Sequence, residues 1–214
     1  QKVVILIDEY DVPLDKAYQN GYYHEMVSLI RGLFGQALKT NDYLQFAILT
    51  GCLRISKESI FTGLNNFEVV SIMDSMYDEC FGFTDKEVQE ILKYFNLSEH
   101  YADIREWYDG YHFVAGGPGI YNPFSLLNTF KYMRLSDYWF ETGTPTYLME
   151  LLKRTNYDLY DMANTETDAD VLNSIDSASN NPIPVIYQSG YLTIKDYEPE
   201  FKIYRLGFPN QEVE

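Results

Sequence analysis

The chain has 214 residues, of which 46% are hydrophobic, and a formal net charge of −16. This size allows one large domain or two small ones with an ordinary hydrophobic core. The acidic surface repels phosphate backbones, which argues against direct nucleic-acid binding. No apolar run reaches the roughly 18–20 residues that a membrane helix needs, so we expect no membrane partner. The only cysteines, Cys52 and Cys80, do not make a disulfide framework in a chain this long, so we expect a reducing, cytoplasmic location.

A continuous apolar run, residues 3–7, begins almost at the first residue and ends at Asp8-Glu9. Its β-branched content and lack of alternation predict a strand buried on both faces, as in a parallel sheet. A chain seldom opens with a core strand, because termini fray unless they are tied down. We therefore expect further residues upstream of Gln1, and a cut after Glu214 as well, since no closing element is recognisable there.

The following segments complete a strand, helix, strand pattern. Apolar residues recur at helical spacing over 24–39, and a second apolar run, 43–50, stops at Gly51. This order is typical of the βαβ unit of an α/β sheet. Residues 67–72 predict a third strand. The first domain is therefore expected to be α/β and to span residues 1–76.

The character of the chain changes near residue 77, and a second, mainly α-helical domain is expected over 77–214. Thr84 and Glu87 form a capping box that opens a helix running to about Phe95. The further helices that the pattern predicts cover 98–108, the stretch from Asn122-Pro123 onward, and 145–153.

The last third of the chain is less regular. The polar stretch 155–182 predicts either a mobile loop or short helices. Two alternating stretches, 190–194 and 201–206, flank Tyr197-Glu198-Pro199-Glu200 and predict a β-hairpin. Helices followed by a hairpin can form a winged-helix-like unit.

The strongest chemical signal is the Asp8-Glu9 pair at the end of the first strand. Ligands of open α/β sheets bind at the carboxyl ends of the strands. Asp8 can hold Mg²⁺ through water, and Glu9 can orient or deprotonate the water that attacks a γ-phosphate. The alternative is a strand end followed by a solvated acidic turn.

Thr50 and Arg54 follow the neighbouring strand and can reach the same edge of the sheet. A polar residue at this point can sense the γ-phosphate, and the Arg54 guanidinium can bind oxyanions in bidentate fashion. The alternative is that Thr50 only ends a strand and that Arg54 pairs with a surface carboxylate.

Several motifs resemble those of the AAA-ATPase-like family of bacterial and archaeal proteins, which often carry a C-terminal PD-(D/E)XK nuclease-like domain. The motifs occur in the family's order over nearly the whole chain. The stretches that carry the resemblance cover residues 6–14, 49–66, 107–113, 121–128, 138–145, 188–194 and 206–210.

The resemblance implies a partial P-loop NTPase parallel-sheet core, followed by the helical, winged-helix-like region. It implies that Asp8 is the Walker B magnesium carboxylate and Glu9 the catalytic carboxylate, with Thr50 and Arg54 in the sensor region. ATP and Mg²⁺ are the cofactors that it implies for the complete protein. It assigns no chemical role to the block 107–113, for which core packing is expected.

One feature of the family is missing from this sequence. The chain contains no Gly-Lys dipeptide, so it has no G-x-x-x-x-G-K-[ST] loop. That loop's backbone amides and lysine hold the phosphates. We therefore expect the chain to be an ATPase fragment that binds ATP poorly alone, with an exposed sheet edge that promotes self-association.

Nuclease and zinc sites are not predicted. The Glu-x-Lys of a nuclease core occurs only at Glu200-Phe201-Lys202, too close to Asp196 for a two-strand site, and reads as a solvated turn. Any nuclease domain would lie beyond residue 214. The histidines are scattered and no Cys-x-x-Cys is present.

Two other functions stay open. The fold can serve as a non-catalytic regulatory or protein-interaction module in which the chemistry is unused. Alternatively, the chain is the ATPase arm of a nucleic-acid-acting, nuclease-fused protein.

Overall fold

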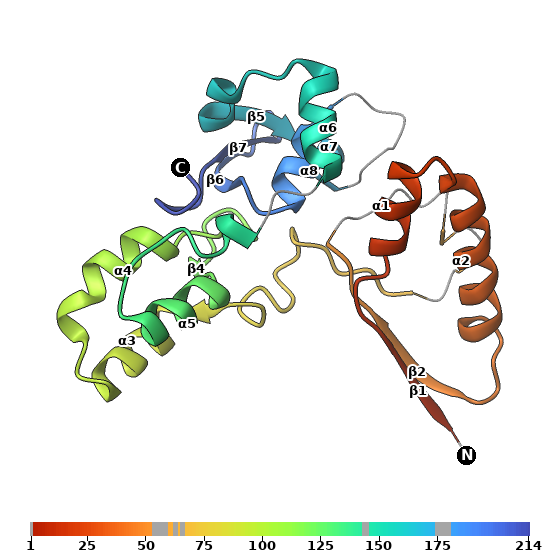
Figure 1. Ribbon diagram of the computed structural model, residues 1–214, viewed down its shortest axis with the longest axis horizontal. Coiled ribbons are helices and arrows are strands. Elements are labelled where there is room, and N and C mark those ends of the chain that lie inside the picture. The colour runs from red at the N-terminus through yellow and green to blue at the C-terminus, as the bar shows by residue number, and fades with distance from the viewer. Residues whose placement is uncertain (1, 53–59, 62–63, 65–66, 143–145, 174–180) are drawn as a thin grey trace. The chain divides into compact units, whose positions relative to one another are not determined.

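The computed structural model describes residues 2–52, 60–61, 64, 67–142, 146–173 and 181–214. The chain forms two compact units (Figure 1). Unit 1 comprises Gln1–Val69 and Asn173–Asn181, and unit 2 comprises Val70–Leu172 and Pro182–Glu214. The predicted boundary after residue 76 falls within unit 2.

Unit 1 is built on two parallel strands joined through helices. Its elements are β1 (Val3–Ile7), α1 (Val12–Gln19), α2 (Tyr23–Leu38) and β2 (Leu44–Leu49). The strands pair in parallel, so their carboxyl ends meet at one edge of the sheet. The predicted strands and the long helix are confirmed, whereas α1, which starts beside Pro13, was not predicted.

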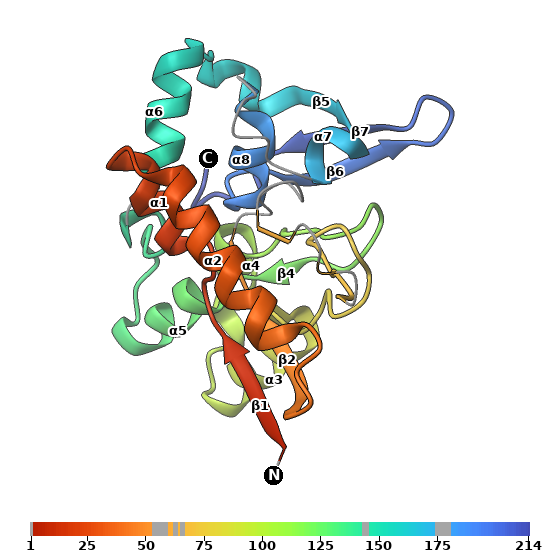
Figure 2. The same ribbon diagram turned by 90° about the vertical axis from the view of Figure 1, so that its right-hand side faces the viewer.

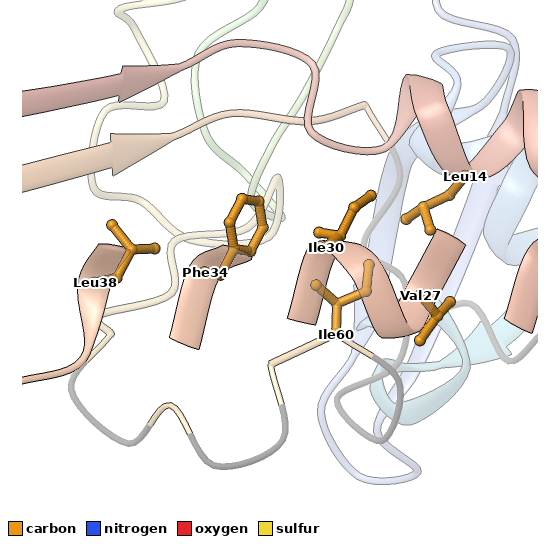
Figure 3. Close-up of a cluster of buried hydrophobic side chains, with 6 residues drawn as sticks. All are labelled: Leu14, Val27, Ile30, Phe34, Leu38 and Ile60. Carbon is orange, nitrogen blue, oxygen red and sulfur yellow. The ribbon is translucent and has the colours of Figure 1, made fainter. Parts of the chain in front are cut away.

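The core of unit 1 lies between α2 and one face of the strands. Figure 2 shows α2 lying across β1 and β2. Strand residues such as Ile5, Ile7 and Ala47 pack against the buried cluster. This cluster, shown in Figure 3, consists of Leu14, Val27, Ile30, Phe34, Leu38 and Ile60.

The prediction that the first strand is buried on both faces is wrong. Val3, the first residue of β1, is exposed by 51%, and four further apolar side chains of the two strands are exposed at alternate positions: Val4 by 42%, Leu6 by 70%, Phe46 by 48% and Ile48 by 53%. Apolar residues alternate between a packed face and an open face, because successive side chains point to opposite sides of a strand. We call Val4, Leu6, Phe46 and Ile48 the open face of unit 1.

The predicted third strand is also wrong. Residues 67–71 are irregular, and Val69 and Val70 are exposed. Hydrogen bonds between Ser71 and Asp74 form a turn at the end of this segment. The Ser71 amide donates to the Asp74 carboxylate at 2.6 Å, and the Asp74 amide donates back to the Ser71 carbonyl at 3.0 Å. Such local side-chain hydrogen bonds favour turns over strands.

Unit 2 begins with a helical half. The short strands β3 (Phe83–Thr84) and β4 (Ile120–Tyr121) pair antiparallel. The predicted capping box is present, because Thr84 and Glu87 bond each other's backbone amides. The helices are α3 (Asp85–Tyr94), η1 (Ser98–His100), α4 (Tyr101–Tyr108) and α5 (Pro123–Tyr132). Their shared core consists of Val88, Leu92, Ile104, Tyr108, Tyr121 and Leu126.

The second half of unit 2 holds a three-stranded antiparallel sheet of order β5-β7-β6. Its strands are β5 (Thr165–Asp168), β6 (Thr193–Glu198) and β7 (Ile203–Gly207). The predicted hairpin is confirmed as β6 and β7, but its turn lies at residues 199–202 and not at 197–200, because Tyr197 and Glu198 still pair with β7. The helices of this half are η2 (Phe140–Thr142), α6 (Thr146–Thr155), η3 (Leu159–Asn164), α7 (Ala169–Asn173) and α8 (Ile183–Gln188).

Strand β5 lies in the polar stretch for which a loop or short helices were predicted. Its sequence, Thr-Glu-Thr-Asp, has no apolar alternation. The strand forms by pairing with β7, where Arg205 contacts Glu166 on one side at 3.1 Å and Asp196 on the other at 3.2 Å. Of the helices that the structure describes, none is long and apolar enough to cross a membrane.

Candidate functional site

Three of the four predicted site residues meet at one edge of the unit 1 sheet. Asp8 and Glu9 follow β1, and Thr50 follows β2, the strand that pairs with it in parallel. All three residues are exposed to solvent. Arg54 lies outside the described residues. The sheet edge therefore presents two carboxylates and a hydroxyl where α/β sheets bind ligands.

Thr50 connects the two strand ends. Its Oγ1 donates a hydrogen bond to Asp8 Oδ1 and accepts one from the Glu9 amide at 3.3 Å. Its own amide donates to the Ile7 carbonyl at 2.9 Å, and its carbonyl accepts from the Tyr10 amide at 2.9 Å. A hydroxyl has a single proton to donate, and here Thr50 donates it in the hydrogen bond to Asp8. In this geometry Thr50 therefore orients Asp8 and does not offer a hydrogen bond to phosphate.

Glu9 has a backbone conformation that is uncommon for a residue with a side chain. Its φ is +52°, in the left-handed region. Such a conformation costs on the order of 1–3 kcal/mol and is concentrated at functional sites. It ends β1 and turns the chain toward α1, so that Asp8 and Glu9 are not presented as successive residues of a regular strand.

Asp11 is a site residue that the sequence did not single out. It is only 6% exposed and occupies the N-cap position of α1, yet its side chain does not cap that helix. Instead, Asp11 Oδ1 accepts a hydrogen bond from the Cys52 amide at 3.3 Å. An acidic residue just before Val12-Pro13 has the sequence signature of an ordinary helix cap, so no local signal predicts this contact.

The turn after β2 packs tightly against the turn after β1. A Cβ atom on Gly51 would lie 2.5 Å from Tyr10 Cε1 and 2.8 Å from Asp11 Oδ1, so only glycine fits there. The next residue, Cys52, is exposed as a whole, but its thiol is perturbed. Partial burial of the thiol, followed by the charges of Asp11 and Glu9, raises the pKa of Cys52 to about 11. Cys52 therefore stays protonated at neutral pH and is a poor nucleophile.

The carboxylate of Asp8 suits a water-mediated magnesium ion. One of its oxygens accepts the Thr50 hydrogen bond and the residue is exposed. Mg²⁺ keeps several waters and uses one or two carboxylates, so a single exposed carboxylate fits this mode of binding. Within the described residues, no group of three or more His, Cys, Asp or Glu side chains could hold a metal ion directly.

Four backbone amides of this edge donate to acceptors within the protein. The amides of Glu9 and Tyr10 donate to Thr50, the Val12 amide donates to the Glu9 carbonyl at 3.1 Å, and the Cys52 amide donates to Asp11. A phosphate cradle needs amides that point at the ligand. These four described amides therefore do not form such a cradle.

The block 107–113 in unit 2 has a packing role, as expected. Tyr108 is fully buried, and its hydroxyl donates to the Ser136 carbonyl and accepts from the Ser136 amide and the Thr129 hydroxyl. Gly110 has a φ of +115°, and a Cβ there would lie 2.2 Å from the Pro209 carbonyl oxygen. This block therefore docks the C-terminal segment onto the helices of unit 2.

The Glu-x-Lys of residues 200–202 lies in the hairpin turn, as expected for a solvated turn. Phe201 is 68% exposed and Lys202 has a φ of +56°. Asp196 contacts Arg205 at 3.2 Å.

Comparisons with known proteins return a relative of unassigned function and a family match to the N-terminal part of the chain. A protein of Azotobacter chroococcum mcd 1, described as "Uncharacterized protein in vnfD 5'region", is 33% identical over 219 residues; the alignment covers 100% of this chain and 41% of that protein. The chain thus spans less than half the length of this relative. No solved structure matches this chain. Residues 1–61, which contain Asp8, Glu9 and Thr50, match the family described as "Predicted AAA-ATPase".

Proposed function

We propose that unit 1 is part of the nucleotide-binding core of an AAA-ATPase-like protein. The observation that carries the proposal is the meeting of Asp8, Glu9 and Thr50 at the carboxyl ends of two parallel strands. This is the edge at which P-loop proteins of the α/β class bind nucleotide and magnesium. The family match over residues 1–61 supports the same assignment.

In this proposal the residues of the edge have separate roles. Asp8 holds a magnesium-bound water, and Thr50 keeps the Asp8 carboxylate in place. Glu9 orients the attacking water and accepts its proton. Arg54, four residues after Thr50, contacts phosphate oxygens. When bound, Mg²⁺ would neutralise charge on the β- and γ-phosphates.

The phosphate cradle and the cover of the open face are assigned to other parts of the complete protein. Four of the described amides at the edge donate internally and do not form a cradle. Parallel sheets are normally covered on both faces, whereas Val4, Leu6, Phe46 and Ile48 are exposed. A P-loop with its strand and helix would supply both the cradle and part of the cover. Unit 2, with its helices and the antiparallel sheet β5-β7-β6, would then be the winged-helix-like region.

Calorimetric titration of Mg²⁺-ATP into the 214-residue chain tests where the phosphates are held. We expect no saturable heat up to millimolar ATP, because the sequence contains no G-x-x-x-x-G-K-[ST] loop. Saturable binding would show that phosphate is held by groups within this chain, and the assignment of the cradle to another segment would be wrong.

A second function is favoured by the open face itself. An exposed apolar sheet face beside unpaired strand edges is a surface on which another protein or a second copy can pair. We therefore carry a non-catalytic interaction module as the alternative. Nucleic-acid binding by these residues is not favoured, because the chain carries a net charge of −16; absence of a gel shift with DNA at low salt would agree with this.

A further inference from the structure

The side chain of Asp11 connects two turns that are distant in the sequence. Its backbone carbonyl begins α1 by accepting from the amides of Leu14 at 2.9 Å and Asp15 at 3.1 Å. Its carboxylate, in contrast, accepts from the Cys52 amide, 41 residues away. A carboxylate that is 6% exposed needs such partners, because an unpaired buried charge is strongly unfavourable.

Shape reinforces this contact. The backbone of Gly51 lies against both the Tyr10 ring and Asp11 Oδ1, with no room for a Cβ. The Tyr10 ring is itself held by an edge-to-face contact with Phe61, with ring centroids 5.3 Å apart, at the border of the buried cluster of unit 1. The turn after β2 is therefore fixed by a hydrogen bond on one side and by an anchored aromatic ring on the other.

Thr50 lies immediately before this fixed turn. Backbone hydrogen bonds to Ile7 and Tyr10 hold it on the β1 side, and the Asp11 contact holds the chain two residues further on. With both flanks fixed, the Thr50 hydroxyl is directed at Asp8 Oδ1. The second carboxylate oxygen of Asp8 makes no hydrogen bond with the described residues, which leaves it available to a magnesium-bound water.

We propose that Asp11 is a positioning residue that acts through the 50–52 turn to hold the Thr50 hydroxyl on the Asp8 carboxylate. Its place in a reaction rests on the proposed ATPase function, whereas the positioning itself does not. Asp11 does not touch nucleotide or metal in this proposal. It sets the orientation of the carboxylate that does.

The test uses the 214-residue chain without nucleotide. Asp11→Ala removes the acceptor, and Asp11→Asn keeps a side-chain oxygen that can still accept from Cys52. Asp15→Ala is the matched control, since Asp15 lies on the same helix and accepts from Gln19 within it. Amide hydrogen exchange reports the turn, and the ¹³C shift of the Asp8 carboxyl carbon reports the Thr50 hydrogen bond.

Loss of one hydrogen bond of about 1 kcal/mol predicts exchange of the Cys52 amide that is roughly fivefold faster in Asp11→Ala. The Asp8 carboxyl shift should move in the same direction as in Thr50→Val, which lacks the hydroxyl. Asp11→Asn should stay close to the wild type on both measures, and Asp15→Ala should change neither.

An Asp8 shift that is unchanged in Asp11→Ala but moves in Thr50→Val would overturn the proposal. If Asp11→Ala does not fold, Gly51→Ala displaces the same turn with both carboxylates intact, and it must move the Asp8 shift in the same way. Because no measurement involves ATP, failure of the ATPase proposal would leave these outcomes unchanged. Conversely, failure here would leave Asp8 and Glu9 as candidate ATPase residues.

Discussion

Glu212 gives the sharpest stability prediction for unit 2. It is 4% exposed, in the C-terminal segment that docks onto the helices of this unit. Its Oε1 accepts hydrogen bonds from the Ser125 hydroxyl at 2.7 Å and from the Trp139 amide at 2.8 Å. Its Oε2 is buried without a partner among the described residues. Glu212→Ala would leave the two donors without this acceptor, whereas Glu212→Gln keeps a side-chain oxygen that can accept from both.

The magnitude follows from the two stranded donors. Each costs about 1–3 kcal/mol when its acceptor is removed, so Glu212→Ala should lower the free energy of unfolding of unit 2 by about 2–6 kcal/mol. Glu212→Gln should lose less than about 1 kcal/mol at neutral pH, because it keeps the acceptor and removes a poorly hydrated charge.

The same site predicts a pH dependence. Burial raises the pKa of Glu212, against the lowering effect of its hydrogen bonds from Ser125 and Trp139, and the nearby Asp137 charge raises it further. The folded state therefore binds this proton more tightly than the unfolded state. Its stabilising contribution is complete below the unfolded-state pKa and is lost as the pH rises through the raised folded-state pKa. Glu212→Gln should accordingly gain stability relative to the wild type as the pH rises from acidic to neutral.

Urea unfolding followed by tryptophan fluorescence measures these differences, because both tryptophans, Trp107 and Trp139, lie in unit 2. Glu99→Ala is the control, since the Glu99 side chain is 80% exposed and should change stability by less than about 0.5 kcal/mol. A Glu212→Ala variant that costs no more than this control would show that Glu212 does not hold the segment as described. The same conclusion follows if Glu212→Gln is as damaging as Glu212→Ala, or if the difference between wild type and Glu212→Gln does not vary with pH.

Three further predictions concern other parts of the chain. Gly110→Ala should lower the free energy of unfolding by at least about 1–3 kcal/mol in urea, because its Cβ would overlap the Pro209 carbonyl at a strained φ; a neutral result would contradict the close approach. Leu6→Glu on the open face should leave the circular dichroism spectrum unchanged and reduce self-association in sedimentation velocity. Unchanged self-association would show that the open face is not the surface through which the chains associate. In a Cys80→Ser background, Cys52 should react with Ellman's reagent at pH 8 more than tenfold slower than in urea, given its pKa of about 11. Equal rates would show that the fold does not raise the pKa of the Cys52 thiol.

The sequence predicted best those elements whose own residues carry the signal. Apolar runs and helical spacing located β1, α2 and β2, and the Thr84 capping box located the start of α3. Features that depend on distant partners were missed. Strand β5 is polar and forms through pairing with β7, and burial of the second face of β1 requires a covering layer that an apolar run cannot specify.

The candidate site shows the same division. The convergence of Asp8, Glu9 and Thr50 followed from a general rule, because parallel strands bring their carboxyl ends to one edge. The role of Asp11 did not, since its partner is a backbone amide 41 residues away and backbone amides carry no sequence signal. The hydrogen bond that the Thr50 hydroxyl donates to Asp8 could not be predicted either, because it depends on how the two strand ends place these side chains.

In the proposed function, Glu9 is the catalytic carboxylate of an ATPase core. The most direct test compares ATP binding and ATP hydrolysis by the complete protein with those of its Glu9→Gln variant, under the same Mg²⁺ concentration. We predict that the variant binds Mg²⁺-ATP as the wild type does and has lost at least about a hundredfold in hydrolysis rate, the low end of the contribution expected from a general base. Hydrolysis at the wild-type rate by Glu9→Gln would contradict the claim.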